Sequence, residues 1–311
     1  MAELELSVLN EMLISNPRGV VENAEREYHE RIAGIAEYIT AHSSIRILLL
    51  AGPSGSGKTT SANLIKDAIE DRGEECLVVS LDDFYRDCDD PDYPKTETGE
   101  RDFERPESLH LELVGRTLLD IADGREFCLP KYDFKQARRT EMRTHHAMPE
   151  GCVIIEGLHA MNPKIYSCLD SDKVLKLFVS VSTNINVDGV RILSGRKLRF
   201  LRRMTRDSIY RGADAERTLE MWRGVLAAED VYLYPYKADA DIAFDTFHAF
   251  EVGVMKKYAE RLISPALAKE NEYAGTVLSA VRRIAPLEER LIPENSLIKE
   301  FIPGGIYEDL Y

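Results

Sequence analysis

The 311-residue chain has an ordinary hydrophobic content of 44% and a formal net charge of −14, which favours a globular core and argues against a general nucleic-acid binder. Its five cysteines are odd in number and lack the spacing of metal or redox motifs. No basic and apolar leader opens the chain, and no apolar run approaches the ~18 residues that span a bilayer. We therefore expect a cytoplasmic protein that does not bind membranes.

The first 44 residues are predicted to be helical. Tyr28, Ile32, Ile35 and Ile39 form one apolar face in an otherwise charged segment. Residues 45–51 (IRILLLA) then form an apolar run with the length of a strand that is buried on both faces. This strand is the first element of the predicted core.

A glycine-rich stretch, GPSGSGKTT, follows that strand directly and fits the phosphate-loop pattern GxxxxGK[ST]. Apolar residues with helical spacing come next, and a strand–loop–helix context is where this pattern binds phosphates. Backbone N–H groups and the helix start would face a polyphosphate, Lys58 would reach its outer phosphates, and Thr59 would ligate Mg²⁺. The predicted nucleotide-binding residues are Gly52, Ser54, Gly55, Ser56, Gly57, Lys58, Thr59 and Thr60.

Further buried strands are predicted at residues 76–81, 152–155, 174–181 and 240–244, with helical stretches such as 111–121 between them. This alternation predicts a three-layer α/β fold with a mostly parallel, doubly wound sheet. Asp82 and Asp83 follow the second strand, and Glu156 ends the third. Because ligands of such sheets bind at the carboxyl ends of the strands, we expect these carboxylates beside the phosphate loop.

Two irregular regions separate the strands. Residues 86–106 are dense in charge and contain three prolines, which predicts a long surface excursion with a functional role. Residues 129–134 (LPKYDF) are short and aromatic, which predicts a β-hairpin arm. Periodicity alone is equally consistent with an ordinary edge strand.

Basic residues concentrate between Arg191 and Arg211. Four of them share one helical face and would repel each other unless an anion lay among them: Arg199, Arg202, Arg203 and Arg206. Gly212 then breaks the helix, as a mobile lid requires. We expect a lid at residues 191–213 that offers guanidinium groups to a transferring phosphoryl group; a solvated charged surface is the alternative.

Six blocks in this order resemble the uridine kinase and phosphoribulokinase family of P-loop kinases, over roughly residues 45–255. They are GPSGSGKT from Gly52, LDDFY from Leu81, DFERP from Asp102, YDF from Tyr132, IEG from Ile155, and RRMTRD from Arg202 with the following Arg211 and Gly212. The end of the chain, IPENSLIKEFIPGG from Ile292, resembles bacterial nucleoside kinases that often carry an N-terminal TGS domain, for which too few residues precede the core here. We expect a kinase core at 45–265 between helical extensions at 1–44 and 266–311.

The resemblance implies roles for individual residues. Asp82 would be the general base toward the acceptor hydroxyl, and Lys58, Arg206 and Arg211 would complete the catalytic set. Thr59 would hold Mg²⁺ directly, while Asp82 and Glu156 fix its water shell. The expected substrate contacts are Asp83, Tyr85, Glu104, Tyr132, Phe134, His159 and Arg203. Asp83 is also the rival candidate for the base, and both Asp83 and His159 have a purely structural role as their alternative.

These observations predict ATP-dependent phosphorylation of a small-molecule hydroxyl with Mg²⁺, in the first place the 5′-hydroxyl of a nucleoside. Uridine kinases carry a His and an Arg at two positions where this chain has Ala137 and Ala213. A kinase for a sugar phosphate, pantothenate or another alcohol is therefore an alternative. A nucleotide-dependent switch is a third, although residues 236–239 (YKAD) lack the Asn of a guanine-binding motif. The choice of ATP or GTP and a homo-oligomeric state stay open.

Overall fold

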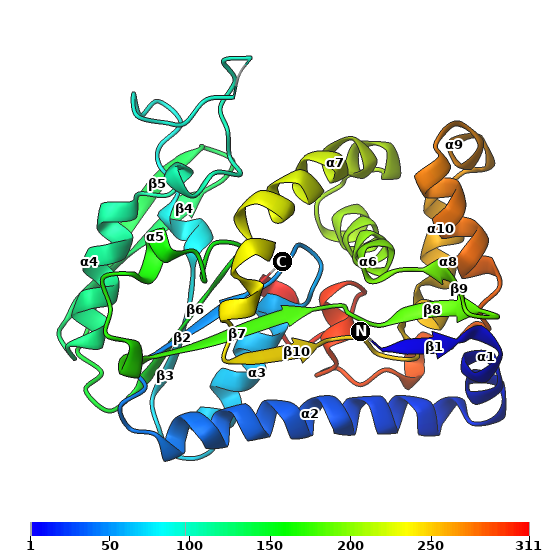
Figure 1. Cartoon of the computed structure of the whole chain (residues 1–311), viewed down its shortest axis with the longest axis horizontal. Helices are drawn as coiled ribbons and strands as arrows, with labels where there is room; N and C mark the ends of the chain where they lie inside the picture. The colour runs from blue at the N-terminus through cyan, green and yellow to red at the C-terminus, as the bar shows by residue number, and fades with distance from the viewer. Residues whose placement is uncertain (1, 97, 311) are drawn as a thin grey trace.

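The computed structural model describes residues 2–96 and 98–310. At its centre lies a parallel five-stranded sheet in the order β10-β7-β2-β6-β3. The strands are β2 (Ile47–Ala51), β3 (Cys76–Ser80), β6 (Cys152–Gly157), β7 (Val174–Ser180) and β10 (Ile242–Asp245). Helices cover both faces (Figure 1), so the predicted doubly wound α/β fold is confirmed.

Two apolar layers meet on β2, all five residues of which are buried. Leu48 and Leu50 belong to the layer of α2 (Pro17–Ala41) and α3 (Lys58–Glu70). Ile47 and Leu49 belong to the layer of α4 (Leu111–Ala122) on the other face. Because side chains alternate along a strand, one unbroken apolar run serves both layers.

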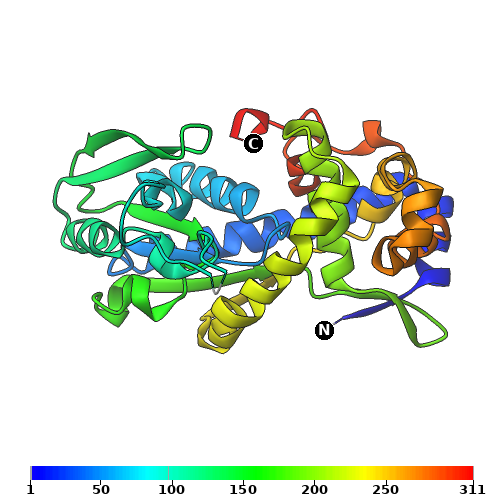
Figure 2. The same cartoon turned by 90° about the horizontal axis from the view of Figure 1, so that it is seen from above.

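The remaining helices are α1 (Leu6–Ser15), α5 (Pro163–Tyr166), α6 (Gly195–Tyr210), α7 (Ala215–Tyr232), α8 (Glu251–Leu262), α9 (Pro265–Glu270) and α10 (Glu272–Arg282). Helix α6 packs on α7 and α8. Seen from above, α6 and α7 lie between the sheet on one side and the α9–α10 pair on the other (Figure 2). None of the helices in residues 2–96 and 98–310 combines the length and apolar character needed to cross a membrane.

The predicted hairpin arm is confirmed. Strands β4 (Phe127–Asp133) and β5 (Arg138–His145) pair antiparallel in a two-stranded sheet of their own, so the edge-strand alternative is wrong. Ala137 lies in the turn with a φ of 54°. The excursion before it also has the predicted character, with short 3₁₀ turns at Leu81–Phe84 and Pro106–Ser108 and an irregular path between them.

A third sheet was not predicted. It contains β1 (Glu3–Glu5), β8 (Asn184–Val187) and β9 (Val190–Leu193), with β1 parallel to β8 and β8 antiparallel to β9. Residues 191–193 therefore end a hairpin, and the basic helix begins at Gly195. The cause is long-range pairing, because the amino-terminal strand lines up with a segment some 180 residues away.

The carboxyl-terminal region is less helical than expected. After α10 the described chain forms only 3₁₀ turns, at Glu289–Leu291, Leu297–Glu300 and Glu308–Leu310. Leu297, Ile298, Phe301 and Ile302 are nevertheless fully buried. This segment therefore packs into the core instead of extending from it.

Candidate active site

The phosphate loop joins β2 to α3 and needs glycine at two positions. Gly55 and Gly57 have φ values of 72° and 85°, in the left-handed region that other residues rarely adopt. A Cβ on Gly55 would also lie 2.8 Å from the carbonyl oxygen of Arg199. Gly57 directly precedes α3, whose first residue is Lys58. The loop thus presents the start of a helix, whose first N–H groups have no partner within the helix, at the carboxyl end of the central strand.

A cavity of about 240 Å³ lies against this loop. Its lining includes Ser54, Gly55, Gly57, Lys58, Thr59, Asp82, Tyr85, Glu104, Glu156, Arg203, Arg206, Arg211, Glu229 and Glu300. The structure therefore brings together all four predicted catalytic residues and all three predicted Mg²⁺ residues. Three predicted loop residues lie outside the lining: Gly52 packs on the Val179 carbonyl, Ser56 is fully buried, and Thr60 binds Glu300.

Two carboxylates form the acidic wall of the cavity. The Ser80 hydroxyl donates to Glu156 Oε1 at 2.7 Å, and the same hydroxyl accepts from the N–H of Asp82 at 3.3 Å. Burial raises the pKa of Asp82 and lifts that of Glu156 to about 7, while the charge of Lys58 opposes the rise in both. The Asp82 charge also raises the pKa of Glu156. Lys58 is thus the main positive charge that acts on both carboxylates of this wall.

The acidic wall fits Mg²⁺. Thr59, Asp82 and Glu156 offer only oxygen ligands, which a hard cation prefers. In the described part of the chain no three acidic, His or Cys side chains converge as a complete metal cage. Mg²⁺ commonly keeps several waters and uses one or two carboxylates plus substrate phosphates. A hydroxyl and two carboxylates beside a phosphate loop meet that requirement.

Arginines form the basic wall around one carboxylate, Asp207. Arg206 donates from Nε and Nη2 to Asp207 Oδ1, each at 3.0 Å. Arg203 Nε lies 3.2 Å from Asp207 Oδ2, and Arg211 Nη1 lies 3.6 Å from Oδ1. Burial lowers the pKa of Arg203, and the positive charge of Arg206 lowers it further. Arg206 Nη1 also lies 3.9 Å from Glu300 Oε1. Three guanidinium groups beside two carboxylates leave an excess of positive charge for an anion such as phosphate.

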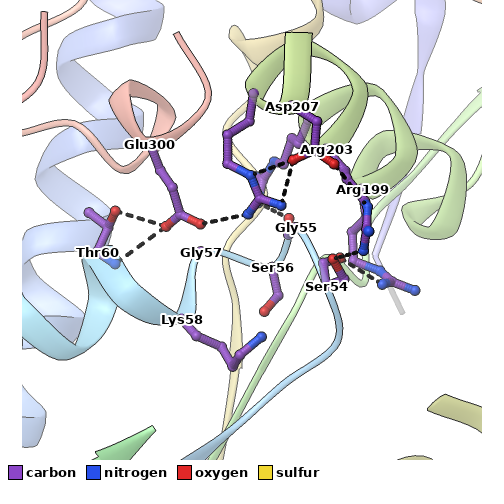
Figure 3. A network of polar contacts seen from close by, with 12 residues as sticks. Ser54, Gly55, Ser56, Gly57, Lys58, Thr60, Arg199, Arg203, Asp207 and Glu300 are labelled. Carbon is purple, nitrogen blue, oxygen red and sulfur yellow. Dashed lines mark hydrogen bonds and ion pairs between the residues drawn. The ribbon is translucent and has the colours of Figure 1, made fainter. Parts of the chain in front are cut away.

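The other two arginines of the predicted stripe do not face a ligand. Arg199 donates to both oxygens of Glu229 at 2.8 Å. It also donates to the Ser54 carbonyl at 2.8 Å, and both residues are labelled in Figure 3. Arg202 Nε donates to Glu251 Oε2 at 2.5 Å, and its Nη1 donates to the Gly55 carbonyl at 3.3 Å.

We expected a ligand anion to balance the charge of all four arginines. This is wrong for Arg199 and Arg202, because carboxylates of the protein balance their charge. Both instead hold the backbone of the phosphate loop.

The predicted substrate residues divide into two groups. Tyr85 and Glu104 line the cavity, together with Arg203, which donates to the Ser54 hydroxyl at 2.9 Å. Burial raises the pKa of Glu104, and Arg203 partly offsets that rise. Tyr132 and Phe134 lie outside the lining. Their rings contact Tyr85, with centroids 5.7 and 6.0 Å from it, and Phe134 is 65% exposed.

Asp83 and His159 lie away from the lining. Asp83 accepts from Lys131 Nζ and from the N–H of Tyr132, both at 3.2 Å, and so ties the hairpin arm to the end of β3. His159 is buried beside the ring of Tyr232. Burial lowers its pKa to about 4, so it is neutral near pH 7. These contacts match the structural alternative for each residue.

Three carboxylates of the site escaped prediction. Asp207 belongs to the RRMTRD block, but it was assigned no role from the sequence. Glu229 lies in no motif that could have pointed to it. Glu300 lies in the C-terminal stretch that resembled nucleoside kinases, which was the one signal that could have pointed to it. Its Oε2 accepts from the Thr60 hydroxyl at 2.9 Å and from the Thr60 N–H at 3.3 Å.

Comparison with known proteins identifies the group to which the chain is related. The sequence pattern of the phosphoribulokinase / uridine kinase family matches residues 47–252, from β2 to the start of α8. The chain belongs to this family. The match contains the phosphate loop, the acidic wall and the three arginines around Asp207. It ends before Glu300, which lies outside the shared region.

Three curated relatives are uridine kinases. The one from Schizosaccharomyces pombe is 31% identical over 197 residues, which are 63% of this chain and 39% of that protein. The one from Saccharomyces cerevisiae is 25% identical over 208 residues, 66% of this chain and 38% of that protein. The one from Staphylococcus aureus strain Newman is 28% identical over 197 residues and is covered to 85%. The chain thus spans about two fifths of the length of the two yeast relatives.

Proposed function

We propose that this protein is a kinase that transfers the γ-phosphoryl group of ATP to a small-molecule hydroxyl, namely the 5′-hydroxyl of a nucleoside such as uridine. The observation that carries the proposal is the single cavity in which Lys58, Asp82 and the arginines around Asp207 face one another. Family membership and the named relatives support the same chemistry.

In this proposal Asp82 accepts the proton of the attacking hydroxyl. Its pKa is raised by burial and held down by Lys58, which suits a group that must take a proton and later release it. Lys58 contacts the transferred phosphoryl group from the loop side, while Arg206 and Arg211 contact it from the side of α6. Phosphoryl transfer needs alignment and charge neutralisation more than covalent chemistry, and these side chains provide both.

Thr59, Asp82 and Glu156 would hold Mg²⁺, which neutralises the phosphate charge when it is bound. On the acceptor side, Glu104 would accept from the sugar hydroxyls, and Tyr85 with the rings behind it would form the wall next to the base. We further propose that residues 45–265 make up the catalytic core. The start of α6 stays fixed to the phosphate loop through Arg199 and Arg202, and the end of the helix, with Arg211 and the turn at Gly212, closes over the cavity as a lid. The cavity of about 240 Å³ suits a small-molecule substrate.

A substrate panel tests the proposal. Purified protein with ATP and Mg²⁺ is offered uridine, cytidine, adenosine and guanosine, and ADP formation is followed. We expect a nucleoside to accelerate ADP formation, and 5′-deoxyuridine, which lacks only the acceptor hydroxyl, to leave it at the background rate. If pantothenate or a sugar phosphate accelerates ADP formation and no nucleoside does, the acceptor is not a nucleoside and the alternative kinase activity is correct. ATP hydrolysis that no acceptor accelerates would favour a switch.

A further inference from the structure

The carboxyl-terminal strap, residues 297–307, meets the start of α3 and closes one side of the nucleotide cavity. Leu297 packs so tightly on the phosphate loop that a Cβ on Gly57 would lie 2.5 Å from its Cδ1. Phe301 lies under the guanidinium of Arg202, whose carbon is 5.1 Å from the ring centroid. The Tyr307 hydroxyl donates to Asp67 of α3. The strap is therefore fixed to the loop, to α6 and to α3.

One carboxylate of the strap, that of Glu300, accepts hydrogen bonds from Thr60 at the end of the phosphate loop. Glu300 is 4% exposed, yet it lines the cavity together with Lys58 and Thr59. One of its oxygens accepts from the hydroxyl and the N–H of Thr60, and the other lies 3.9 Å from Arg206 Nη1. In Figure 3 the carboxylate points at Thr60 directly beside the phosphate loop.

The groups that Glu300 uses are those that a phosphate needs. The first N–H groups of α3 and the loop in front of it form an anion site, because they have no partner within the helix. A carboxylate in this place offers the same negative charge and acceptor oxygens as a phosphate. Glu300 thus accepts from two donors of Thr60 that a phosphate would use, and its other oxygen lies 3.9 Å from Arg206.

A bound nucleotide cannot use the same donors at the same time. Two anions within a few ångströms of each other repel strongly in a site of low dielectric. The phosphate nearest Thr60 would meet the Glu300 carboxylate unless that side chain turned away. The anchors at Leu297, Phe301 and Tyr307 do not involve Glu300 itself, so this one side chain can move while the strap stays in place.

We propose that Glu300 is a built-in competitor for the donor nucleotide and sets its affinity: its carboxylate occupies a phosphate position on Thr60 and leaves when the nucleotide binds. This inference rests on the proposed function, since it assumes that the loop takes a nucleotide. Displacement also removes the carboxylate that lies 3.9 Å from Arg206, so that this guanidinium, which stays bonded to Asp207, has more positive charge to offer to the phosphates.

The test is nucleotide affinity without chemistry. ADP with Mg²⁺ is titrated by calorimetry into the full chain, into Glu300→Gln, and into Glu294→Gln as a control that removes an exposed carboxylate of the same region. Glu300→Gln keeps the size of the side chain and removes the charge. We expect it to lower the Kd for ADP roughly tenfold, the factor expected when no charge-assisted hydrogen bond must be broken first. Glu294→Gln should leave the Kd unchanged.

The outcomes separate this inference from the proposed function. If the unaltered chain binds neither ADP nor ATP, the proposed function fails. If it binds and Glu300→Gln binds equally or more weakly, Glu300 is not a competitor and the inference fails. Should Glu300→Gln not fold, as judged by circular dichroism, a crystal structure of the unaltered chain with ADP decides. There the Glu300 carboxylate must have left Thr60, and a carboxylate still bound to Thr60 beside ADP would overturn the proposal.

Discussion

Helix α6 carries two sets of arginines that differ in how many carboxylates serve them. On the loop side, Arg199 and Arg202 are buried and each has a glutamate of its own, at 2.8 and 2.5 Å. On the cavity side, Arg203, Arg206 and Arg211 share Asp207. The residue type is the same, and all of them except Arg211, which directly follows the helix, lie on α6. The two sets differ in the number of carboxylates per arginine. The first set is fully paired and has a structural role, whereas the second set keeps positive charge that can bind a phosphate.

The same contrast exists among the acids. Glu229 and Glu251 are buried against arginines, whereas Glu156 is buried beside the solvent-exposed Asp82, with Lys58 as the main opposing charge of both. A buried charge that is paired has a structural role. Removing one member of the pair leaves the other member buried without a counter-charge. An underpaired buried charge costs stability and is retained where chemistry needs it. Changes on the two sides should therefore affect different measurements.

The largest effect is expected at Asp82. Asp82→Asn removes the general base but keeps the shape, so kcat should fall roughly 10²–10⁴-fold. Binding of ADP and the unfolding midpoint should stay close to those of the parent. Asp83→Asn is the matched control, because Asp83 binds the hairpin arm, and it should retain most of the turnover. Near-normal kcat in Asp82→Asn would show that the base is another group.

A scaffold arginine should affect stability instead. Arg202→Met leaves Glu251 buried without its cation and should lower the free energy of unfolding by about 3–5 kcal/mol, as measured by urea denaturation. The double change Arg202→Met with Glu251→Leu should recover much of that loss, since no unpaired charge is left. A loss of less than 1 kcal/mol in the single variant would mean that the pair does not hold the loop.

A third prediction concerns a buried glutamate that, unlike Glu229 and Glu251, has no arginine beside it in the described part of the chain. Glu25 of α2 is buried and faces His29 Nε2 at 3.8 Å and His248 Nε2 at 4.0 Å. Burial raises the pKa of Glu25 to about 7 and lowers that of His248 to about 3. A raised carboxyl pKa costs stability as pH rises from the unfolded value of 4.5 to about 7, after which the cost is constant.

Glu25→Gln should therefore stabilise the protein by on the order of 3 kcal/mol at pH 8 and by almost nothing at pH 4.5. Thermal or urea unfolding across that range measures the difference. Glu27→Gln, on an exposed position of the same helix, should change stability by no more than about 0.5 kcal/mol at either pH. A gain that does not vary with pH would exclude ionisation of Glu25 as its cause.

The smallest effect is expected on the cavity side of α6. Arg211→Lys keeps one positive charge and loses the planar fork that binds two phosphate oxygens, so kcat/KM should fall roughly tenfold, equivalent to about 1.4 kcal/mol. Stability should stay within about 0.5 kcal/mol, because the Arg211 side chain is 53% exposed. A drop in stability larger than the drop in activity would place Arg211 with the scaffold arginines.

The sequence was sufficient wherever the signal was local. The apolar runs predicted every strand of the central sheet, and the glycine pattern with Lys58 located the cavity. Helical spacing placed Arg199, Arg202, Arg203 and Arg206 on one face, but it could not show which of them has a carboxylate of its own and which share Asp207. The deciding partners, Glu229 and Glu251, are 30 and 49 residues away from theirs. The aromatic pair Tyr132 and Phe134 was found, but its position outside the cavity lining depends on tertiary packing.

During synthesis on the ribosome, the phosphate loop is made well before the strap that covers it. Glu300 follows Thr60 by 240 positions, so at 5–20 residues per second a ribosome makes the loop roughly 12–48 s before the carboxylate that covers it. Throughout that interval the phosphate loop has no strap, and the surface that Leu297 later covers is open. A nucleotide present during synthesis would therefore meet the loop before Glu300 exists and could support folding of the core at that stage.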